Sequence, residues 1–526
     1  MKKKWLKALP WIVLAAAYLF SVAFWGLYGS HNLISDDSAE LLLARQLNEE
    51  GGIISENWYY STELRLASPV QVYQLTLRIF PENWQAARTL AAAFIMAAVA
   101  GCAVYAAYGL GLRKSAPWIA TVLVLPFSGA YSWLVIYQCH YCVHIGLALL
   151  MLGMIARSGR ASGRRRVLLC VALTAAALVG GLNGVRILTM FIVPVFAAVV
   201  LMAALACKAH ATFREAAGEP EVRMLVPTLL ATAAAGAGYV INMKVLSGRY
   251  AYYNYGLENL KKFSAADFLH QIDGLVDMFG YYQGASFFSL KGIASFVGFG
   301  IVILLLLAVL RMLTRWKHLS APLRLLTMTT VTAVALGMTL NVLLGQTLAR
   351  YFLLGILLMM ITLAAAVETE PCKNGALRGL AGAAVMACFL FQTGCGVLYG
   401  YRQGDVNYEM AADWLLENGY TQGYATFWNA NLLTEASDGQ IEMWVLSDRG
   451  EAEWTSLRLH TMLQEASHLT RDPQGRVFLL VDEIENQADA PVLDEGHLVG
   501  ELVGWSYYVY GYESVDEMRA LIGEGQ

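Results

Sequence analysis

The chain has 526 residues, of which 57% are hydrophobic and only 15% are charged, and its mean hydropathy is +0.49. Soluble domains carry about 25% charged residues, so this composition excludes an ordinary soluble protein and indicates a polytopic membrane protein. The net charge of −3 gives no sign of a nucleic-acid partner, and we expect none.

The first apolar segment runs from Trp11 to Tyr28 and is long enough to cross a bilayer. Lysines within residues 2–7 should hold its start on the cytoplasmic side, because positive charge stays inside. The residues after Phe24 lack a small-residue cleavage pattern, so we interpret the segment as an uncleaved anchor rather than a signal peptide.

Two adjacent carboxylates, Asp36 and Asp37, follow this span and are therefore predicted to lie at the outer membrane surface. Either aspartate can cap a helix from Ser38 to about Glu49 that Gly51 and Gly52 end. The helix would lie in the membrane interface on an apolar stripe. The stripe consists of Leu42, Leu43, Gln46 and Leu47.

About eleven apolar segments have transmembrane length. Their approximate limits are 9–28, 86–110, 117–135, 139–156, 166–183, 186–206, 222–243, 292–312, 322–343, 350–367 and 378–398. Clusters of Lys and Arg fall in alternate loops between them, on the side of the N-terminus, as the positive-inside rule predicts. These basic residues are Arg113, Lys114, Arg157, Arg160, Arg164 to Arg166, Lys208, Arg214, Arg223, Arg311, Arg315, Lys317, Arg324, Lys373 and Arg378.

An odd number of spans places the chain after residue 398 outside the cell, together with the long loops 29–85 and 244–291. We therefore predict a transmembrane domain over 1–398 and a small extracytoplasmic α/β domain over 399–526. Within the second domain, soluble-type patterns predict helices at 407–418 and 514–521 and strands at 476–481 and 506–510. The aromatic segment 427–431 fits either a carbohydrate-facing surface or, more commonly, a domain core.

The chain resembles the GT-C class of integral-membrane glycosyltransferases, which includes protein O-mannosyltransferases and lipid A aminoarabinose transferases. One cytoplasmic-start span leads to the acidic segment Ser35-Asp36-Asp37-Ser38-Ala39-Glu40, and many further spans and an outer C-terminal domain follow. The resemblance implies an inverting transfer of a sugar from a polyprenyl-phosphate donor to a hydroxyl of a lipid, glycan or protein acceptor. The acidic residue after the first span would be the catalytic base. The resemblance leaves open which aspartate acts and whether a divalent cation is needed. We assign no metal ligand.

Two arginines are predicted to face outward, where positive charge is otherwise scarce. Arg186 follows Gly180-Gly181-Leu182-Asn183-Gly184-Val185, and Arg350 opens a late span as Arg350-Tyr351. Because arginine binds phosphate bidentately, we expect both to hold the donor phosphate. The alternative is that each is a snorkelling anchor at the end of a span, just as the aspartates could merely cap a helix.

Other polar residues are candidate substrate contacts. His31 and His140 are predicted to line the outer cavity, and Arg249 and Tyr250 begin the second long loop with cations and aromatics that suit sugars, or that form an ordinary aromatic belt. The cluster Cys139-His140-Tyr141-Cys142-Val143-His144 allows a metal, but one CxxC without a second ligand pair is a weak zinc signal.

A glycosyltransferase at the outer face is our first functional hypothesis, and a transporter or lipid flippase is the alternative. Transporters place ionisable residues and broken helices near the bilayer midplane. Here the spans are nearly free of charge and polar residues gather at their outer ends, which favours an enzyme at the membrane surface. A scaffold that uses only the C-terminal domain would leave the aspartate pair unexplained.

Overall fold

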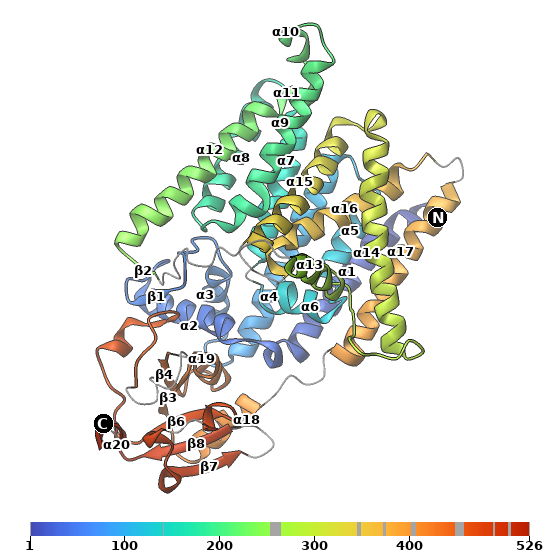
Figure 1. Ribbon diagram of the computed structural model, residues 1–526. Helices are drawn as coiled ribbons and strands as arrows, with labels where there is room; N and C mark the ends of the chain where they lie inside the picture. The colour runs from blue at the N-terminus through green and yellow to red at the C-terminus, as the bar shows by residue number, and fades with distance from the viewer. Residues whose placement is uncertain are drawn as a thin grey trace.

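The computed structural model describes residues 2–139, 141–252, 265–343, 349–371, 375–400, 407–447, 457–487, 490–502 and 507–524. A large helical part formed by residues before 400 carries a smaller domain of strands and helices at one end (Figure 1). We call residues 407–524 the C-terminal domain.

The chain begins with the long helix α1, and a loop with its own short helices and strand follows. These elements are α1 (Lys2–Tyr28), η1 (Ser30–Asn32), α2 (Ser35–Glu50), β1 (Trp58–Tyr60) and α3 (Val70–Ile79). Helix α2 carries the aspartate pair and packs against α3 and against the C-terminal domain.

The rest of the helical part consists of packed helices, among which α4 runs parallel to α7, α8 runs parallel to α12, and α9 packs along α15. Its first elements are α4 (Trp84–Leu110), α5 (Ala116–Val124), α6 (Gly129–Tyr131), η2 (Ser132–Tyr137), α7 (Cys142–Ser158), α8 (Gly163–Gly181), η3 (Leu188–Ile192), α9 (Val193–Lys208), α10 (Phe213–Ala216), α11 (Pro220–Arg223), α12 (Leu225–Val240), η4 (Ile241–Val245), η5 (Leu246–Gly248) and β2 (Ala251–Tyr252). The later ones are α13 (Ala265–Asp277), α14 (Leu290–Thr314), η6 (Trp316–His318), α15 (Ala321–Leu343), η7 (Ala349–Phe352), α16 (Leu353–Thr369), α17 (Gly375–Cys395) and η8 (Gly396–Gly400).

Seven helices within the described ranges are long and apolar enough to cross a membrane, or eight if α5 and the segment Gly129–Tyr137 form one span bent by 89°. Pro126 lies in this bend, where it cannot continue a helix. Each predicted span coincides with a helical segment, but α7 and α16 have only 17 residues and α8 begins with three arginines. The prediction of a polytopic helical membrane protein is confirmed, whereas the count of eleven is not.

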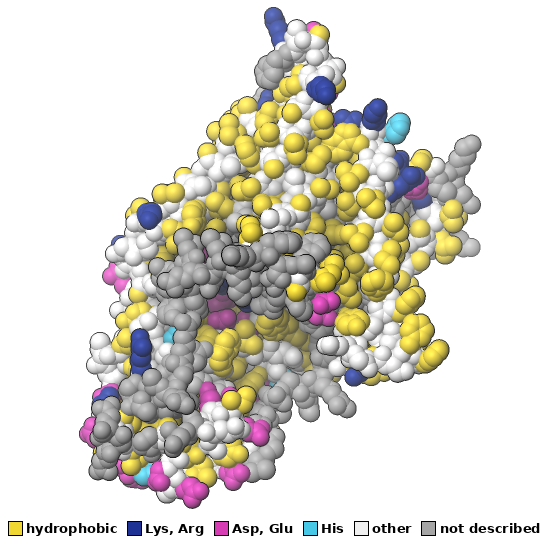
Figure 2. Space-filling model, in the orientation of Figure 1, with side chains coloured by type: hydrophobic (Ala, Val, Ile, Leu, Met, Phe, Trp, Pro, Cys, Tyr) yellow, Lys and Arg dark blue, Asp and Glu magenta, His cyan; other side chains and the backbone are white. Residues whose placement is uncertain are grey.

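Apolar side chains cover the surface of the helical part, as a membrane-embedded protein requires. Figure 2 shows them over the helices on the visible face, while Asp and Glu gather over the C-terminal domain. Examples are Leu229, Leu307 and Leu310, each more than half exposed.

Helix α2 differs from its prediction in two respects. It begins at Ser35 rather than Ser38, so the N-cap residue is Ile34 and neither aspartate is the cap. The expected lipid-facing stripe is largely covered by protein, because α3 and helix α19 (Phe427–Ala436) of the C-terminal domain pack on α2 and Leu43, Gln46 and Leu47 are buried. The predicted end is confirmed, since Gly51 takes the left-handed conformation (φ 74°) that stops a helix.

The C-terminal domain is an α/β unit around a five-stranded sheet of order β4-β3-β6-β8-β7. Strand β3 pairs with β4 and β6 in parallel, and β8 is antiparallel to β6 and β7. Its elements are α18 (Asn407–Glu417), β3 (Gln422–Thr426), α19 (Phe427–Ala436), β4 (Glu442–Leu446), β5 (Gln464–Glu465), η9 (Ala466–Leu469), β6 (Val477–Asp482), η10 (Glu485–Gln487), η11 (Pro491–Leu493), η12 (Glu495–His497), β7 (Leu498–Leu502), β8 (Tyr507–Tyr512) and α20 (Val515–Glu524).

A small sheet joins the C-terminal domain to the two long loops. Strand β1 lies between β2, which is parallel to it, and β5, which is antiparallel. Three segments far apart in sequence therefore meet beside α2, and they fix the C-terminal domain against the helical part.

Candidate functional site

The two aspartates lie in the first turn of α2, but in different surroundings. Asp37 is fully buried, and its Oδ2 accepts a hydrogen bond of 3.0 Å from the backbone N–H of Ile34. The backbone carbonyl of Asp37 accepts a 2.6 Å hydrogen bond from Arg88. Asp36 keeps partial solvent exposure. Asp37 therefore stabilises the start of the helix, while Asp36 is accessible.

Glu40 lies one turn along the same helix, close to both aspartates. Desolvation by burial raises the pKa of Asp37 to about 7, against the favourable charge of Arg88. Burial likewise raises the pKa of Glu40 to about 7, although Arg65 pairs with it at 3.1 Å. Because the two carboxyls also repel each other, this turn holds less negative charge near neutral pH than its sequence suggests.

Arg186 lies at the turn between α8 and η3, where it faces the aspartate turn. Its guanidinium is 3.8 Å from Glu63 and lies over the ring of Tyr141 at 5.3 Å. It also interacts electrostatically with Asp36 and Tyr351. The structure thus places Asp36 and Arg186, two residues predicted for the active site, within electrostatic range of each other.

The glycine-rich segment before Arg186 explains how this arrangement is held. Asn183 is buried, accepts from the backbone N–H of Ala67 at 2.8 Å and donates to its carbonyl at 2.6 Å. Gly184 has φ 89° and lies so close to Glu63 that a Cβ would be 2.2 Å from the carboxylate oxygen. Only glycine fits there, and the loop after α2 is therefore clamped to the turn that carries Arg186.

Arg350 belongs to η7 and contacts Tyr351, with which Arg186 also interacts electrostatically. Its Nη2 donates to the hydroxyl of Tyr351 at 3.2 Å, and its guanidinium lies 5.0 Å from the centre of that ring. The buried Nε of Arg350 has no hydrogen-bond partner among the described residues. Since buried donors are normally paired, an anionic ligand would satisfy this group.

The other predicted contacts have partners elsewhere. His31 pairs with Glu409 of the C-terminal domain at 3.3 Å. Arg249 is exposed and pairs with Glu56, and Tyr250 packs edge-on against Tyr60 with ring centres 6.2 Å apart. Their assignment to the substrate stays a prediction. His140 lies outside the described residues.

A buried network links the aspartate turn to the C-terminal domain, and the sequence analysis did not anticipate it. Arg88 of α4 is 1% exposed and donates to both carboxylate oxygens of Glu435 in α19, at 2.9 Å for Nη2. The hydroxyl of Ser35 donates to the carbonyl of Phe427 at the start of α19. An arginine within an otherwise apolar span is the signal that could have identified this network.

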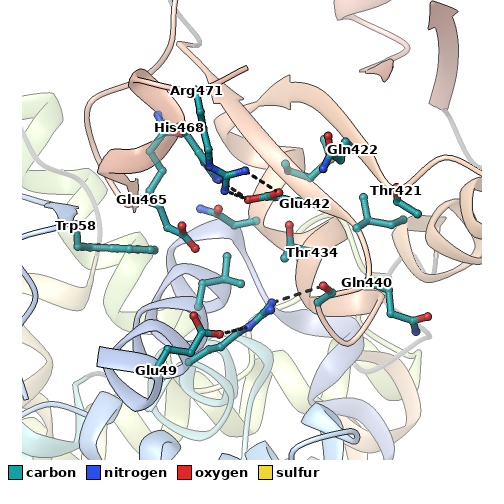
Figure 3. A pocket seen from close by; sticks show the side chains of 17 residues that line it. Glu49, Trp58, Thr421, Gln422, Thr434, Gln440, Glu442, Glu465, His468 and Arg471 are labelled. Carbon is teal, nitrogen blue, oxygen red and sulfur yellow. Dashed lines mark hydrogen bonds and ion pairs between the residues drawn. The ribbon is translucent and has the colours of Figure 1, made fainter. Parts of the chain in front are cut away.

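A cavity of about 410 Å³ lies at the other end of α2, and we call it the seam pocket. It opens between α2 and β1 on one side and the C-terminal domain on the other (Figure 3). Six of the side chains that line it are Arg45, Glu49, Trp58, Glu442, Glu465 and Arg471.

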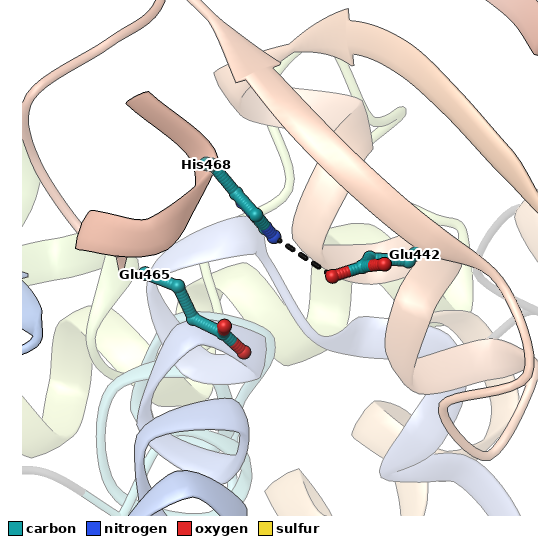
Figure 4. A group of neighbouring side chains, drawn as sticks. All are labelled: Glu442, Glu465 and His468. Atoms are coloured by element: carbon teal, nitrogen blue, oxygen red, sulfur yellow. Dashed lines mark hydrogen bonds and ion pairs between the residues drawn. The ribbon is translucent and has the colours of Figure 1, made fainter. Parts of the chain in front are cut away.

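Glu442, Glu465 and His468 beside the seam pocket are the one group of described residues with ligand atoms close enough to hold a metal ion (Figure 4). However, His468 lies 3.1 Å from Glu442, and Arg471 donates to both oxygens of the same carboxylate. Burial raises the pKa of Glu442, but these bonds lower it to about 2 overall. A cation would have to displace Arg471, so the group as arranged does not fit a metal.

The cysteine segment predicted as a weak metal candidate has a structural role in its described part. The thiols of Cys139 and Cys142 are buried and donate to the carbonyls of Ile136 and Val135 at 3.3 and 3.2 Å. Cys139 has a positive φ of 56°, which turns the chain between η2 and α7.

No protein-family model and no curated protein matches the sequence. The fold is nevertheless similar to solved structures. ArnT from Cupriavidus metallidurans, bound to undecaprenyl phosphate, aligns over 97% of this chain and 98% of its own with a TM-score of 0.57 and 11% identity. The apo state of the same protein aligns over 98% and 99% with a TM-score of 0.53 and 13% identity.

The Archaeoglobus fulgidus oligosaccharyltransferase, in complex with Zn and sulfate, aligns over 92% of this chain and 70% of its own with a TM-score of 0.50 and 14% identity. ArnT and this transferase are GT-C glycosyltransferases, so the predicted resemblance to that class is confirmed for the fold. The protein is a multi-pass membrane protein with this architecture.

Proposed function

We propose that the chain is an inverting membrane glycosyltransferase that moves a sugar from a polyprenyl phosphate to a hydroxyl of a lipid, glycan or protein acceptor. The observation that carries the proposal is the placement of a partly exposed carboxylate, Asp36, within electrostatic range of Arg186 at a turn clamped by Asn183. The alignment over nearly the whole of an ArnT bound to undecaprenyl phosphate supports a lipid-phosphate donor.

Asp36 acts as the general base. Its carboxylate takes the proton of the acceptor hydroxyl while that oxygen attacks the anomeric carbon of the donor sugar. The bond between this carbon and the phosphate oxygen breaks, and polyprenyl phosphate leaves. Attack from the side opposite the leaving group inverts the configuration at the anomeric carbon. Asp37 contributes by holding the helix start and is the weaker candidate for the base, because it is buried and bonded to the backbone.

Arg186 and Arg350 stabilise the departing phosphate. Both face Tyr351, so their positive charges converge on one region next to Asp36. Guanidinium groups in a partly buried site stabilise charge that develops on phosphate oxygens far better than they would in water. The pairing of Arg186 with Glu63 at 3.8 Å is loose enough for phosphate to replace it.

The membrane orientation belongs to this proposal. All eleven helical segments cross the membrane, the N-terminus is cytoplasmic, and residues 399–526 with loops 29–85 and 244–291 lie outside. His31, His140, Arg249 and Tyr250 contact substrate at the outer face. A divalent cation remains an addition to be tested, since the residues beside the seam pocket do not fit one as they are arranged.

The test is to supply the purified protein with a panel of polyprenyl-phosphate sugars and to follow the release of lipid phosphate. We expect at least one donor to be consumed in the presence of an acceptor hydroxyl. Transport of such lipids across reconstituted vesicles without any sugar transfer would instead support the flippase alternative. Addition of EDTA in the same assay tests the need for a cation.

A further inference from the structure

The seam pocket is not explained by the transfer chemistry around Asp36. It lies at the C-terminal end of α2, where Arg45 is nine residues and therefore about 14 Å from Asp36 along the helix axis. Its walls come from the loop that carries the aspartates and from the C-terminal domain, so a molecule bound there would touch both parts (Figure 3).

The charges that line the seam pocket are largely paired with each other. Arg45 bonds to Glu49 at 3.1 Å, and Arg471 binds Glu442 through both carboxylate oxygens. Glu465 is the remaining charged group, apart from His468. With its arginines engaged, the pocket offers no spare cation for a phosphate, and Arg471 stands where a metal ion would have to bind.

The rest of the lining consists of uncharged polar groups, one aromatic ring, Gly439 and the apolar side chains of Leu42, Ile441 and Met443. Gln422, Thr434 and Gln440 contribute polar side chains to its rim and walls, and the indole of Trp58 lies at one side (Figure 3). Amides and hydroxyls both donate and accept hydrogen bonds, which matches the hydroxyl groups of a sugar. A mainly apolar pocket would favour a peptide side chain, whereas the seam pocket is mainly polar.

Trp58 provides an independent indication of a ligand. Its side chain is only 1% exposed, and its Nε1 has no hydrogen-bond partner among the described residues. A buried indole N–H almost always finds an acceptor, because leaving it unpaired costs free energy. A hydroxyl oxygen of a bound sugar would satisfy it.

We propose that the seam pocket is an acceptor subsite that binds a neutral sugar residue of a glycan acceptor. The inference rests on the proposed glycosyl transfer, for which it names the acceptor class. A glycan held at this end of α2 can extend along the helix, so that a hydroxyl of a further sugar residue reaches Asp36. The C-terminal domain then selects the acceptor by forming half of the subsite.

The test measures binding without turnover. Purified full-length protein carrying Asp36→Asn is mixed with N,N′-diacetylchitobiose, cellobiose or mannobiose, and saturation-transfer NMR reports contact with the sugar. We expect at least one disaccharide to give a signal. The signal should fall at least fivefold in Gln440→Trp, where an exposed residue is enlarged into the pocket, and in Trp58→Phe, which removes the indole N–H. Arg519→Gln, a surface change outside the pocket, should leave it intact.

Three results would overturn the proposal. They are the absence of signal with all three disaccharides, a signal that survives both pocket variants in folded protein, and binding of Zn²⁺ or of a serine-containing peptide at the pocket in place of sugar. Thermal unfolding of each variant separates loss of binding from loss of structure. The binding measurement needs neither donor nor turnover. Absence of disaccharide binding would therefore not contradict the proposed glycosyl transfer, and absence of transferase activity would not contradict the binding result.

Discussion

The two ends of helix α2 use charge in opposite ways. At the N-terminal end, Asp37, Glu40 and Arg88 are buried, Glu435 is 10% exposed, and all four have partners from other elements. At the C-terminal end, Arg45 and Glu49 are exposed and pair within a single helix turn. Removing a buried charge leaves its partner uncompensated, whereas exposed pairs contribute about 0–1 kcal/mol. Substitutions at the first end should therefore change catalysis and folding, and those at the second should change ligand binding alone.

The largest expected effect separates the two aspartates. Asp36→Asn should lower kcat about 10³-fold, within the range typical of a lost general base, and leave the unfolding midpoint unchanged. Asp37→Asn should retain more activity, because an amide oxygen can still accept from the Ile34 N–H. Release of lipid phosphate measures both. Full activity in both variants would refute the assignment of the base.

The next effect concerns the bridge to the C-terminal domain. Glu435→Gln leaves the buried guanidinium of Arg88 without its countercharge and should cost about 3–5 kcal/mol of stability. Chemical unfolding in detergent, followed by circular dichroism, provides the measurement. Asp472→Asn is the matched control, because its pair with Arg519 is exposed and should contribute at most about 1 kcal/mol. Equal losses of stability in the two variants would show that the pair of Arg88 and Glu435 contributes no more than an exposed ion pair.

Local sequence signals predicted much of this architecture. The helix at 407–418, the strands at 476–481 and 506–510 and the helix at 514–521 correspond to α18, β6, β8 and α20, since turn residues and periodicity act over short range. Gly419, with φ 78°, follows the first of them in the left-handed conformation that stops a helix. The positions of the membrane spans could be predicted equally well, because a bilayer requires long apolar helices.

Long-range pairings could not be predicted in the same way. Arg88 and Glu435 are separated by 347 positions, and the sheet of β2, β1 and β5 joins two loops to a separate domain. One sequence does not indicate which distant charges meet. For the same reason the lipid-facing stripe expected on α2 proved wrong: its apolar residues are covered by α3 and α19, which the helix itself does not reveal.

A smaller effect should distinguish the phosphate contacts from the base. Arg350→Ala removes a charge-assisted donor worth about 1.5–3 kcal/mol, so the KM for the lipid donor should rise roughly ten- to hundredfold. The KM for the acceptor should stay within about twofold, because Arg350 faces Tyr351 and the proposed leaving group. Arg350→Lys should recover only part of the loss, since an ammonium cannot bind phosphate bidentately. An unchanged donor KM would remove Arg350 from the phosphate site.

A last effect is a dependence of stability on pH at the buried carboxyls. Burial raises the pKa of Asp37 and of Glu40 to about 7, so between pH 5 and 7 the folded protein holds protons that the unfolded chain has released. Stability must then fall as the pH rises through this window, because the folded protein has to release the protons that it retains. The double variant Asp37→Asn/Glu40→Gln keeps the acceptor oxygens and removes both ionisations. Subtracting its unfolding free energy from that of the parent at each pH cancels the histidines, and a difference that rises with pH would contradict the burial of these two groups.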